Sequence, residues 1–284
     1  MRLVITGAAG MLGQDLAAAA KDAGHDVLAL ARADLDIADR AAADEAVRTA
    51  RPHVVFNCAA WTDVDGAEAD PAGALAVNGA GAGNVAGAAA AAGAWTIHVS
   101  SDYVFDGAKR TPYVESDAVR PLSSYGRSKL AGEREVSAEA PERHTIVRSS
   151  WLFGAGGPCF PATILRLAGE RDVLKVVDDQ IGCPTFTGHL AQALVDLAAR
   201  QWPPVGILHV AGGGFCSWYE FAREIVAASG VSCEVRTCTT GEMPRPATRP
   251  AYSVLGSERD APVLPDWRRG LAEYMALTRA VSAT

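Results

Sequence analysis

Short apolar runs alternate with amphipathic stretches through the first half of the 284-residue chain. Bounded apolar runs of this length are typical of buried strands, and the longer stretches between them have the spacing of helices. The strands are expected at residues 3–6, 27–30, 54–57, 96–99 and 145–148. The helices are expected at residues 11–23, 40–50, 73–92 and 124–138. This alternation predicts an α/β fold with a doubly wound parallel sheet.

The alternation loosens after about residue 150. Residues 173–177 and 207–210 have the composition of further sheet strands, and a proline-rich piece covers residues 244–250. Ser217 and Glu220 form the capping-box pattern before a helix over residues 217–228. We therefore expect one domain over residues 1–150, joined by parts of 173–210, and a smaller domain made mainly of 151–284.

Three glycines follow the first predicted strand. Gly7, Gly10 and Gly13, spaced G-x-x-G-x-x-G, lead through Met11 and Leu12 into the first helix. A strand, a glycine turn and a helix N-terminus form a cradle for a pyrophosphate, because the glycines let the backbone approach closely and the helix end offers free N–H groups. The pattern predicts a Rossmann-like dinucleotide site, and a tight turn without a ligand is the alternative.

The loops after the other strands bear on the choice of cofactor. No acidic residue stands at positions 30–33, where one would bind the ribose 2′-hydroxyl of NADH, and Arg32 could accept a 2′-phosphate. This favours NADPH and leaves NADH open. Ala59 and Ala60 follow the third strand, and their small side chains would let the cofactor approach closely.

Tyr125 and Lys129 are four residues apart in the last helix of the first half. This spacing places both side chains on one helix face. An ammonium near a phenol favours the phenolate, so we expect Lys129 to lower the pKa of Tyr125 and prepare it for proton transfer. Taken alone, such a pair is also found on solvated helix faces.

Composition and charge narrow the classes of function. The net charge of −7 argues against a nucleic-acid partner. The six cysteines form no C-x-x-C motif, and neither His189 nor His209 has metal-ligand partners at a recognisable spacing, so no metal site is expected from the residues. Residues 79–94 are alanine- and glycine-rich and too short for a membrane span. A soluble cytoplasmic protein without a signal peptide fits these features.

Several longer segments, in order along nearly the whole chain, resemble the extended short-chain dehydrogenase/reductase family. They are Gly7–Gln14, Asn57–Asp65 with Glu68 and Val77–Asn78, Ser100–Gly107, Tyr125–Lys129 with Gly132–Glu133, Arg148–Gly154, Val177–Thr185, Ser217–Phe221, Pro244–Pro250 and Leu264–Trp267. The similarity is greatest to reductases of dTDP-linked 4-keto-6-deoxyhexoses. Ser101 stands where that group usually has threonine, which keeps the hydroxyl and loses the β-branch that restrains it.

The resemblance implies NADPH-dependent reduction of dTDP-4-dehydro-β-L-rhamnose to dTDP-L-rhamnose. It implies Tyr125 as proton donor, Lys129 as the residue that poises Tyr125 and binds the nicotinamide ribose, and Ser101 as hydrogen-bond donor to the developing oxyanion. Asp36 and Ile37 resemble the pair that contacts adenine. The implied substrate-binding residues are Ser101, Asp102, Tyr103, Trp151, Arg245 and Arg249.

Some of these roles have structural alternatives. Ser101 could bond only its own backbone, Asp102 could cap its loop, and Trp151 could be a core residue. Arg245 and Arg249 could be solvated rather than bind the substrate pyrophosphate. Some family members have been associated with Mg²⁺ at a subunit interface, but no acidic cluster for it is evident here.

Three other functions compete with this interpretation. A nucleotide-sugar epimerase or dehydratase is one, although the dehydratases resembling this fold carry Asp-Glu after the catalytic hydroxyl residue and this chain has Asp102-Tyr103. A sister 4-ketoreductase of an antibiotic-sugar pathway, such as a dihydrostreptose synthase, would use the same chemistry. A non-catalytic regulatory subunit like the methionine adenosyltransferase beta subunit has no need of a poised tyrosine. The resemblance suggests a monomer or homodimer.

Overall fold

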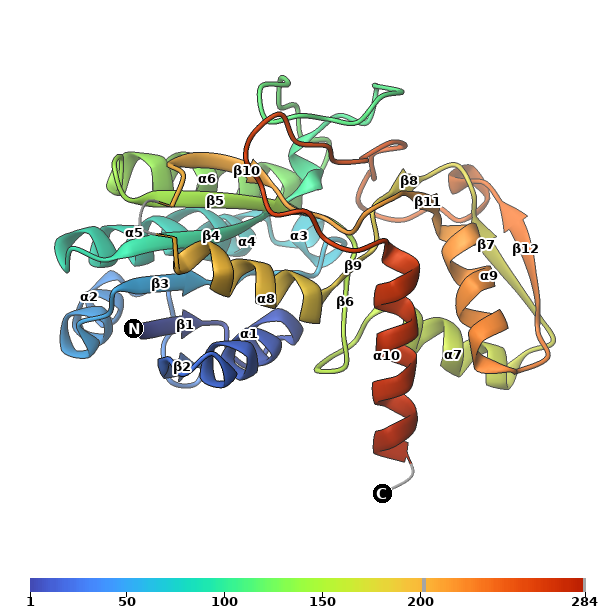
Figure 1. Cartoon of the computed structure of the whole chain (residues 1–284). Coiled ribbons are helices and arrows are strands. Elements are labelled where there is room, and N and C mark those ends of the chain that lie inside the picture. Colours follow the sequence, from blue (N-terminus) through green and yellow to red (C-terminus); the bar gives the residue numbers. More distant parts are fainter. Residues whose placement is uncertain (201–202, 283–284) are drawn as a thin grey trace.

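Six parallel strands form the central sheet of the computed structural model, which describes residues 1–200 and 203–282 (Figure 1). The strands are β1 (Arg2–Thr6), β2 (Asp26–Leu30), β3 (Val54–Asn57), β4 (Trp95–Ser101), β5 (His144–Ser149) and β10 (Gly206–His209). Their order is β10-β5-β4-β3-β1-β2. The chain runs from β1 outward to β2 and then returns to the other side of β1 as β3. In such sheets, ligands bind beyond the carboxyl ends of the strands at this point of reversal.

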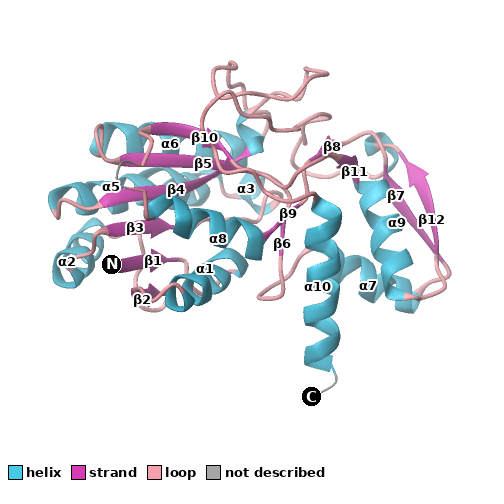
Figure 2. Ribbon diagram, viewed as in Figure 1, coloured by secondary structure: helices cyan, strands magenta, loops and turns pink. Residues whose placement is uncertain are grey.

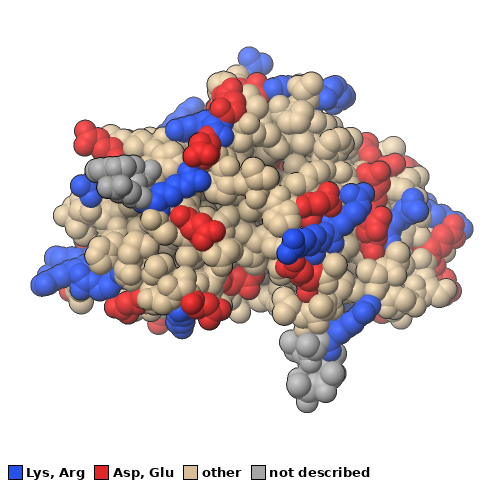
Figure 3. All heavy atoms as spheres, in the orientation of Figure 1, with Lys and Arg blue, Asp and Glu red and all other residues tan. Residues whose placement is uncertain are grey.

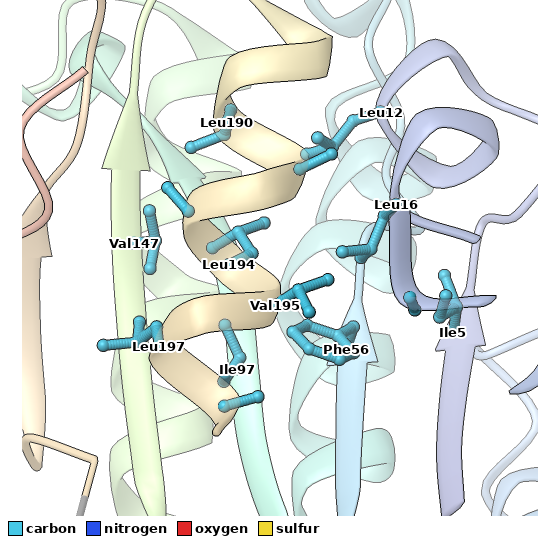
Figure 4. Close-up of a cluster of buried hydrophobic side chains, with 14 of the residues drawn as sticks. Ile5, Leu12, Leu16, Phe56, Ile97, Val147, Leu190, Leu194, Val195 and Leu197 are labelled. Atoms are coloured by element: carbon cyan, nitrogen blue, oxygen red, sulfur yellow. The ribbon is translucent and has the colours of Figure 1, made fainter. Parts of the chain in front are cut away.

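Helices cover both faces of the sheet, as the alternating pattern predicts. One face is covered by α1 (Met11–Asp22) and α8 (Thr187–Ala198), and the other by α2 (Arg40–Ala50), α5 (Ala82–Ala91) and α6 (Ser124–Glu139). Figure 4 shows α8 lying over the sheet, with Leu194 and Leu197 directed at Ile97 and Val147. These buried aliphatic contacts hold the strand ends that carry the site.

The helix expected at residues 73–92 is present but is not a uniform α-helix. It is preceded by α3 (Gly66–Ala69), begins as α4 (Pro71–Leu75), passes through a π-helical turn, η1 (Ala76–Gly81), and continues as α5. π-helical turns occur often at functional sites. Here the turn carries Asn78, whose side chain reaches the loop that follows β3.

The rest of the chain forms a second layer of structure beside the sheet (Figure 2). Its elements are β6 (Leu152–Phe153), α7 (Phe160–Glu170), β7 (Val173–Val177), β8 (Ile181–Gly182), β9 (Thr185–Phe186), β11 (Cys216–Ser217), α9 (Trp218–Ser229), β12 (Glu234–Cys238) and α10 (Trp267–Ser282). Two short 3₁₀ turns are also present: η2 (Asp102–Val104) follows β4, and η3 (Thr240–Glu242) follows β12. Phe153, Phe221, Trp267 and Tyr274 pack in its core.

Two expected strands have different partners. The strand at residues 207–210 is β10, which extends the main sheet beside β5. The strand at residues 173–177 forms as β7, but it pairs with β12 in a separate two-stranded sheet rather than with the main sheet. The capping box at Ser217 and Glu220 is present at the start of α9.

Two features of the structure bear on its possible partners: the length of its apolar helices and the charge on its surface. Among the residues that the structure describes, no helix is both long and apolar enough to cross a bilayer. Figure 3 shows basic and acidic side chains interspersed on that face. A site for an anionic ligand must therefore supply its own local positive charge.

Candidate active site

The glycine loop takes the conformation that a pyrophosphate cradle requires. Gly7 has φ +68°, and a Cβ on it would lie 2.5 Å from the backbone nitrogen of Ala59. A Cβ on Gly13 would lie 2.3 Å from the carbonyl oxygen of Gly7. Helix α1 begins after Gly10 with no side-chain cap. Its first N–H groups are therefore available to an anion, with the positive end of the helix dipole behind them.

A cavity of about 470 Å³ opens over this loop. Of the expected cofactor-binding residues, it is lined by Gly7, Gly10, Arg32, Asp36, Ile37, Ala59 and Ala60. Met11, Leu12 and Gly13 lie in α1 and do not line it. Tyr125 and Lys129, which were also expected to bind the cofactor, lie in α6 and do not line it either. The residues that sequence reasoning missed are Ala9, Leu35, Cys58, Trp61, Thr62, Asp63 and Val77. Their position directly after β1, β2 and β3, or on the facing helix, was the available signal.

Arg32 is the first charged residue after β2 that lines the cavity, and Asp36, further along the same loop, also lines it. Asp34, the first acidic residue after β2, accepts a hydrogen bond from the backbone of Ala31 at 2.9 Å, which closes a turn. Arg32 is exposed and lines the cavity. This arrangement agrees with a basic rather than an acidic partner for the adenosine ribose.

Asn78 ties the cavity wall to α6. Its side-chain oxygen accepts from the backbone N–H of Trp61 at 2.8 Å, and its amide donates to the hydroxyl of Ser128 at 2.9 Å. Trp61 lines the cavity, and Ser128 precedes Lys129. The loop after β3 and the helix with Tyr125 are therefore held in one arrangement.

Helix α6 brings Tyr125 and Lys129 to the same end of the sheet. Its N-terminus is capped by Ser123, whose hydroxyl accepts from Gly126 N–H at 3.1 Å. Lys129 is buried, and its Nζ donates to the carbonyl oxygen of Val99 on β4 at 2.8 Å. Burial lowers the pKa of Lys129 to about 8, while Glu133 and Cys58 oppose that shift.

The pKa of Tyr125 differs from the sequence-based expectation. Enclosure of the phenol raises this pKa to about 12, and the adjacent Ser101 hydroxyl only partly opposes the rise. Lys129 is not among the groups that shift this pKa, and the nearby carboxyl of Asp102 adds to the rise, so the expected lowering is absent. The phenol therefore stays protonated at neutral pH, which suits a proton donor.

Ser101 ends β4 and caps the short turn η2. Its hydroxyl donates to Oδ1 of Asp102 at 3.0 Å and accepts from the backbone N–H of Tyr103 at 3.2 Å. The backbone-bonded alternative for Ser101 is thus present in this structure. The same hydroxyl also faces the phenol of Tyr125, so a ligand oxygen placed there could accept a hydrogen bond from Ser101 in place of Asp102.

Asp102 is a buried carboxyl beside these groups. Burial raises its pKa to about 6, and the neighbouring hydroxyls of Ser253 and Ser101 only partly hold it down. Its Oδ2 has no hydrogen-bond partner within the described part of the protein. Buried unpaired oxygens are uncommon and often mark places where a ligand binds.

We expect Asp102→Asn to stabilise the protein at neutral pH. Because the folded-state pKa lies above the unfolded value, stability from the neutral carboxyl is present below about pH 4 and is lost as pH rises through about 6. A shift of about two pKa units corresponds to about 3 kcal/mol. Urea unfolding at about pH 4 and pH 8 should show the gain in the free energy of unfolding only at the higher pH.

Asp106 provides the opposite control. The hydroxyl of Tyr113 donates to Asp106 at 2.7 Å and lowers the pKa of this carboxyl. Asp106→Asn should therefore lose stability at neutral pH. An equal pH dependence of unfolding in wild-type protein and Asp102→Asn would show that Asp102 ionises without cost.

Two aromatic residues, Tyr103 and Trp151, follow the ends of β4 and β5. The ring of Tyr103 meets the ring of Tyr125 edge-on, with 5.5 Å between centroids. Trp151 has φ +48°, a strained conformation for a bulky residue, and stacks on Trp218 with centroids 3.4 Å apart. Trp151 is half-buried and packs against the hydrophobic core of the second layer, and backbone strain of this kind is often found at functional positions.

The two arginines of the proline-rich segment differ. Arg249 forms a bidentate ion pair with Asp65, with both distances 2.9 Å, so its charge is already partnered. Arg245 is exposed, with no hydrogen bond or ion pair to another described residue. The pair between Asp65 and Arg249 ties the segment after β3 to residues 244–250, an attachment that sequence reasoning missed.

No metal site is evident. Within residues 1–200 and 203–282, no three histidine, cysteine or acidic side chains are grouped so as to hold an ion. His189 contacts Glu273 at 2.9 Å, and His209 contacts the backbone of Tyr113 and Gly256. The Mg²⁺ that was left open from the sequence therefore has no support here.

Several known reductases of dTDP-linked sugars are similar to this chain over nearly its whole length. The chain is 46% identical to a dTDP-4-dehydrorhamnose reductase of Mycolicibacterium smegmatis, covering 97% of this chain and 85% of the relative. It is 40% identical to a dTDP-4-keto-6-deoxy-D-glucose reductase of Streptomyces niveus, covering 98% of each. The crystal structure of a dTDP-4-dehydrorhamnose reductase from Bacillus anthracis with NADP superimposes with TM-score 0.92 at 36% identity, covering 98% of this chain and 99% of that one.

The family comparison covers almost the whole chain. The model described as RmlD substrate binding domain matches residues 1–280. This range includes the glycine loop, the end of β4 with Ser101, and the helix with Tyr125 and Lys129. The chain belongs to the RmlD substrate binding domain family.

Proposed function

We propose that this protein is an NADPH-dependent oxidoreductase that reduces dTDP-4-dehydro-β-L-rhamnose to dTDP-L-rhamnose. The observation that carries the proposal is the protonated phenol of Tyr125 beside the Ser101 hydroxyl, in a protein that also has a cavity over its glycine loop. A ketone that accepts a hydride develops negative charge on its oxygen and needs a proton donor there. The names of the relatives supply the dTDP-sugar class.

The cavity residues fit a nicotinamide dinucleotide. The uncapped start of α1 suits the pyrophosphate, and the close approach of Gly7 to Ala59 leaves room for no side chain between the two loops. The similar Bacillus anthracis protein was crystallised with NADP. When bound, the cofactor supplies the hydride, and the protein supplies position and the proton.

Three side chains would act on the ketone oxygen and its surroundings. Tyr125 would donate its phenolic proton, and its high pKa makes the proton available at every physiological pH. Ser101 would turn its hydroxyl from Asp102 to the developing oxyanion. Lys129 would compensate the charge left on Tyr125 and bind the nicotinamide ribose, since its ammonium is charged below about pH 8.

The sugar would bind between the strand ends and the second layer. Asp102, with an unpartnered oxygen, and Tyr103 would contact its hydroxyl groups. The stacked Trp151 would form an aromatic wall. Arg245 is the better candidate for the substrate pyrophosphate, because Arg249 would first have to leave Asp65. Arg249 could still bind a phosphate in the same bidentate way, by exchanging the carboxylate of Asp65 for it.

The cofactor preference should depend on Arg32. We expect Arg32→Ala to weaken NADPH binding by about ten-fold, as loss of one exposed contact between arginine and phosphate implies. NADH has no 2′-phosphate, so its affinity should be nearly unchanged. Fluorescence titration with both cofactors measures the two effects, with Arg2→Ala, on β1, as a control. Equal losses for both cofactors would exclude the 2′-phosphate role.

A second candidate is a sister reductase that makes a different deoxysugar. The similarity to the Streptomyces niveus dTDP-4-keto-6-deoxy-D-glucose reductase favours it, since hydride delivery to a 4-keto group uses the same residues. A UDP-glucose 4-epimerase of Thermus thermophilus shares the fold at only 21% identity, which carries no functional argument.

The deciding experiment combines NADPH oxidation with product identification. The purified protein is mixed with NADPH and dTDP-4-dehydro-β-L-rhamnose, the loss of NADPH absorbance is followed, and the sugar is identified by NMR. Oxidation with dTDP-L-rhamnose as product supports the proposal. Oxidation that gives another sugar supports the sister reductase. If the protein binds NADPH but does not oxidise it, both reductase candidates are contradicted for this substrate and a non-catalytic binding subunit is favoured.

A further inference from the structure

Glu133 continues the row of functional residues on α6. Tyr125, Lys129 and Glu133 follow one another at four-residue spacing, so they lie on one helix face. The carboxylate of Glu133 is 3% exposed and pairs with Arg148 of β5, which is 2% exposed. Nε and Nη2 of Arg148 donate to Oε1 and Oε2 of Glu133 at 2.8 and 2.7 Å.

The ion pair reaches across three strands. Ser100 of β4 and His209 of β10 are the register partners of Arg148 on its two sides. The Ser100 hydroxyl donates to Oε1 of Glu133 at 2.6 Å, and Nη1 of Arg148 lies 3.4 Å from Nε2 of His209. Arg148 also lies 5.1 Å from the ring centre of Phe105. One carboxylate therefore holds α6 to both β4 and β5.

Stability alone is a weak reason for this pair. Burying two charges costs about as much as their attraction returns, so replacing both with apolar residues is often neutral. Two successive residues of β4 are nevertheless bonded to this helix face: Val99 accepts from Lys129, and Ser100 donates to Glu133. The next residue is Ser101, whose hydroxyl faces Tyr125.

We propose that the Glu133–Arg148 pair is a positioning unit for the reduction, which through Ser100 fixes α6 against β4 where Tyr125, Lys129 and Ser101 meet. The proposal rests on the proposed function, because it assigns the pair to that site. Neither Glu133 nor Arg148 touches the reacting atoms. They act through the residues one helical turn or one strand position away.

The carboxylate of Glu133 also places negative charge near Lys129, whereas Arg148 is not among the groups that shift the pKa of Lys129. The titratable groups that face Lys129 are Glu133 on the same helix, Cys58 after β3 and His98 on β4. Burial raises the pKa of Cys58 to about 12 and lowers that of His98, so both are neutral around Lys129. Glu133 favours the ammonium form of Lys129 more than Cys58 does.

The test replaces both charges at once. Glu133→Met with Arg148→Met removes the pair and leaves no buried charge, so we expect a Tm near the wild-type value and an NADPH Kd within about two-fold. We expect kcat to fall by about ten-fold or more, since small displacements of catalytic groups are costly, with little change in KM. Wild-type kcat at an unchanged Tm would overturn the proposal.

Two further measurements keep the proposal decidable. The Lys129 ammonium, titrated by NMR without any substrate, should have a lower midpoint in the double variant, and an unchanged midpoint counts against the pair. An inert wild-type enzyme would contradict the proposed function and leave this titration valid. If the double variant does not fold, Ser100→Ala decides: it should fold and lose about three-fold or more in kcat, whereas full activity would overturn the proposal.

Discussion

Replacing Tyr125 with phenylalanine should lower kcat by about 10²- to 10⁴-fold, the range by which a positioned proton donor accelerates a reaction. Only the phenolic hydroxyl is removed, and the ring can keep its edge-on contact with Tyr103. Tyr125 does not line the cavity that opens over the glycine loop. NADPH affinity should therefore stay within about two-fold, which corresponds to less than 0.5 kcal/mol.

The measurement pairs steady-state turnover with fluorescence titration of NADPH. Tyr219→Phe is the matched control, because the ring of Tyr219 on α9 contacts the guanidinium of Arg223, 5.8 Å away, and takes no part in the proposed chemistry. Near-normal turnover of Tyr125→Phe would remove Tyr125 from the role of proton donor. A combined loss of turnover and NADPH binding would instead assign Tyr125 to cofactor binding.

The pH dependence gives a second view of the same residues. Lys129 loses its charge as pH rises through about 8, whereas the phenol of Tyr125 stays protonated until about 12. The alkaline fall in kcat/KM, which reports groups of the free enzyme, should therefore follow Lys129 rather than Tyr125 when the rate is measured from about pH 6 to pH 10.

The strands of the sheet were largely predictable because each one follows a local pattern. Apolar runs such as residues 3–6 and 54–57 are buried on both faces in a parallel sheet, so they need no partner to be recognised. The partner of a run is set by tertiary structure. Residues 173–177 and 207–210 have similar composition, yet only the second joins the main sheet.

The site was predictable where its chemistry is local. The glycine loop and the four-residue spacing of Tyr125 and Lys129 are visible in short segments. The pairing of Asp65 with Arg249 joins residues 184 positions apart, and no local pattern indicates it. Arg148 was a possible signal, because a charged residue inside an apolar strand needs a buried partner.

The pKa of Tyr125 shows a different limit. Spacing on a helix indicates which charge is near the phenol, and this led to the expectation of a lowered pKa. It does not indicate how far the phenol is removed from water. Desolvation dominates in the folded protein, so Tyr125 is a weaker acid than a free phenol and at neutral pH holds the proton that it would donate to a reduced ketone.

Gly13→Ala should produce the largest loss of cofactor binding. Its Cβ would lie 2.3 Å from the carbonyl oxygen of Gly7 and 2.8 Å from Cα of Ala8, both backbone atoms that cannot rotate away. The loop must therefore shift, and a displacement of about 1 Å at a preorganised site costs about 100-fold. We expect NADPH affinity to fall by at least about that factor, measured by fluorescence titration beside a thermal unfolding curve.

Gly169→Ala is the matched control for this substitution. Gly169 lies in α7, and a Cβ there would meet no atom within 4 Å. Alanine should stabilise that helix by up to about 1 kcal/mol and leave NADPH binding unchanged. If Gly13→Ala bound NADPH as tightly as Gly169→Ala, the contact between the loop and the start of α1 would not shape the pyrophosphate site. The cofactor would then be held mainly by the walls after β2 and β3, where Arg32 and Trp61 lie.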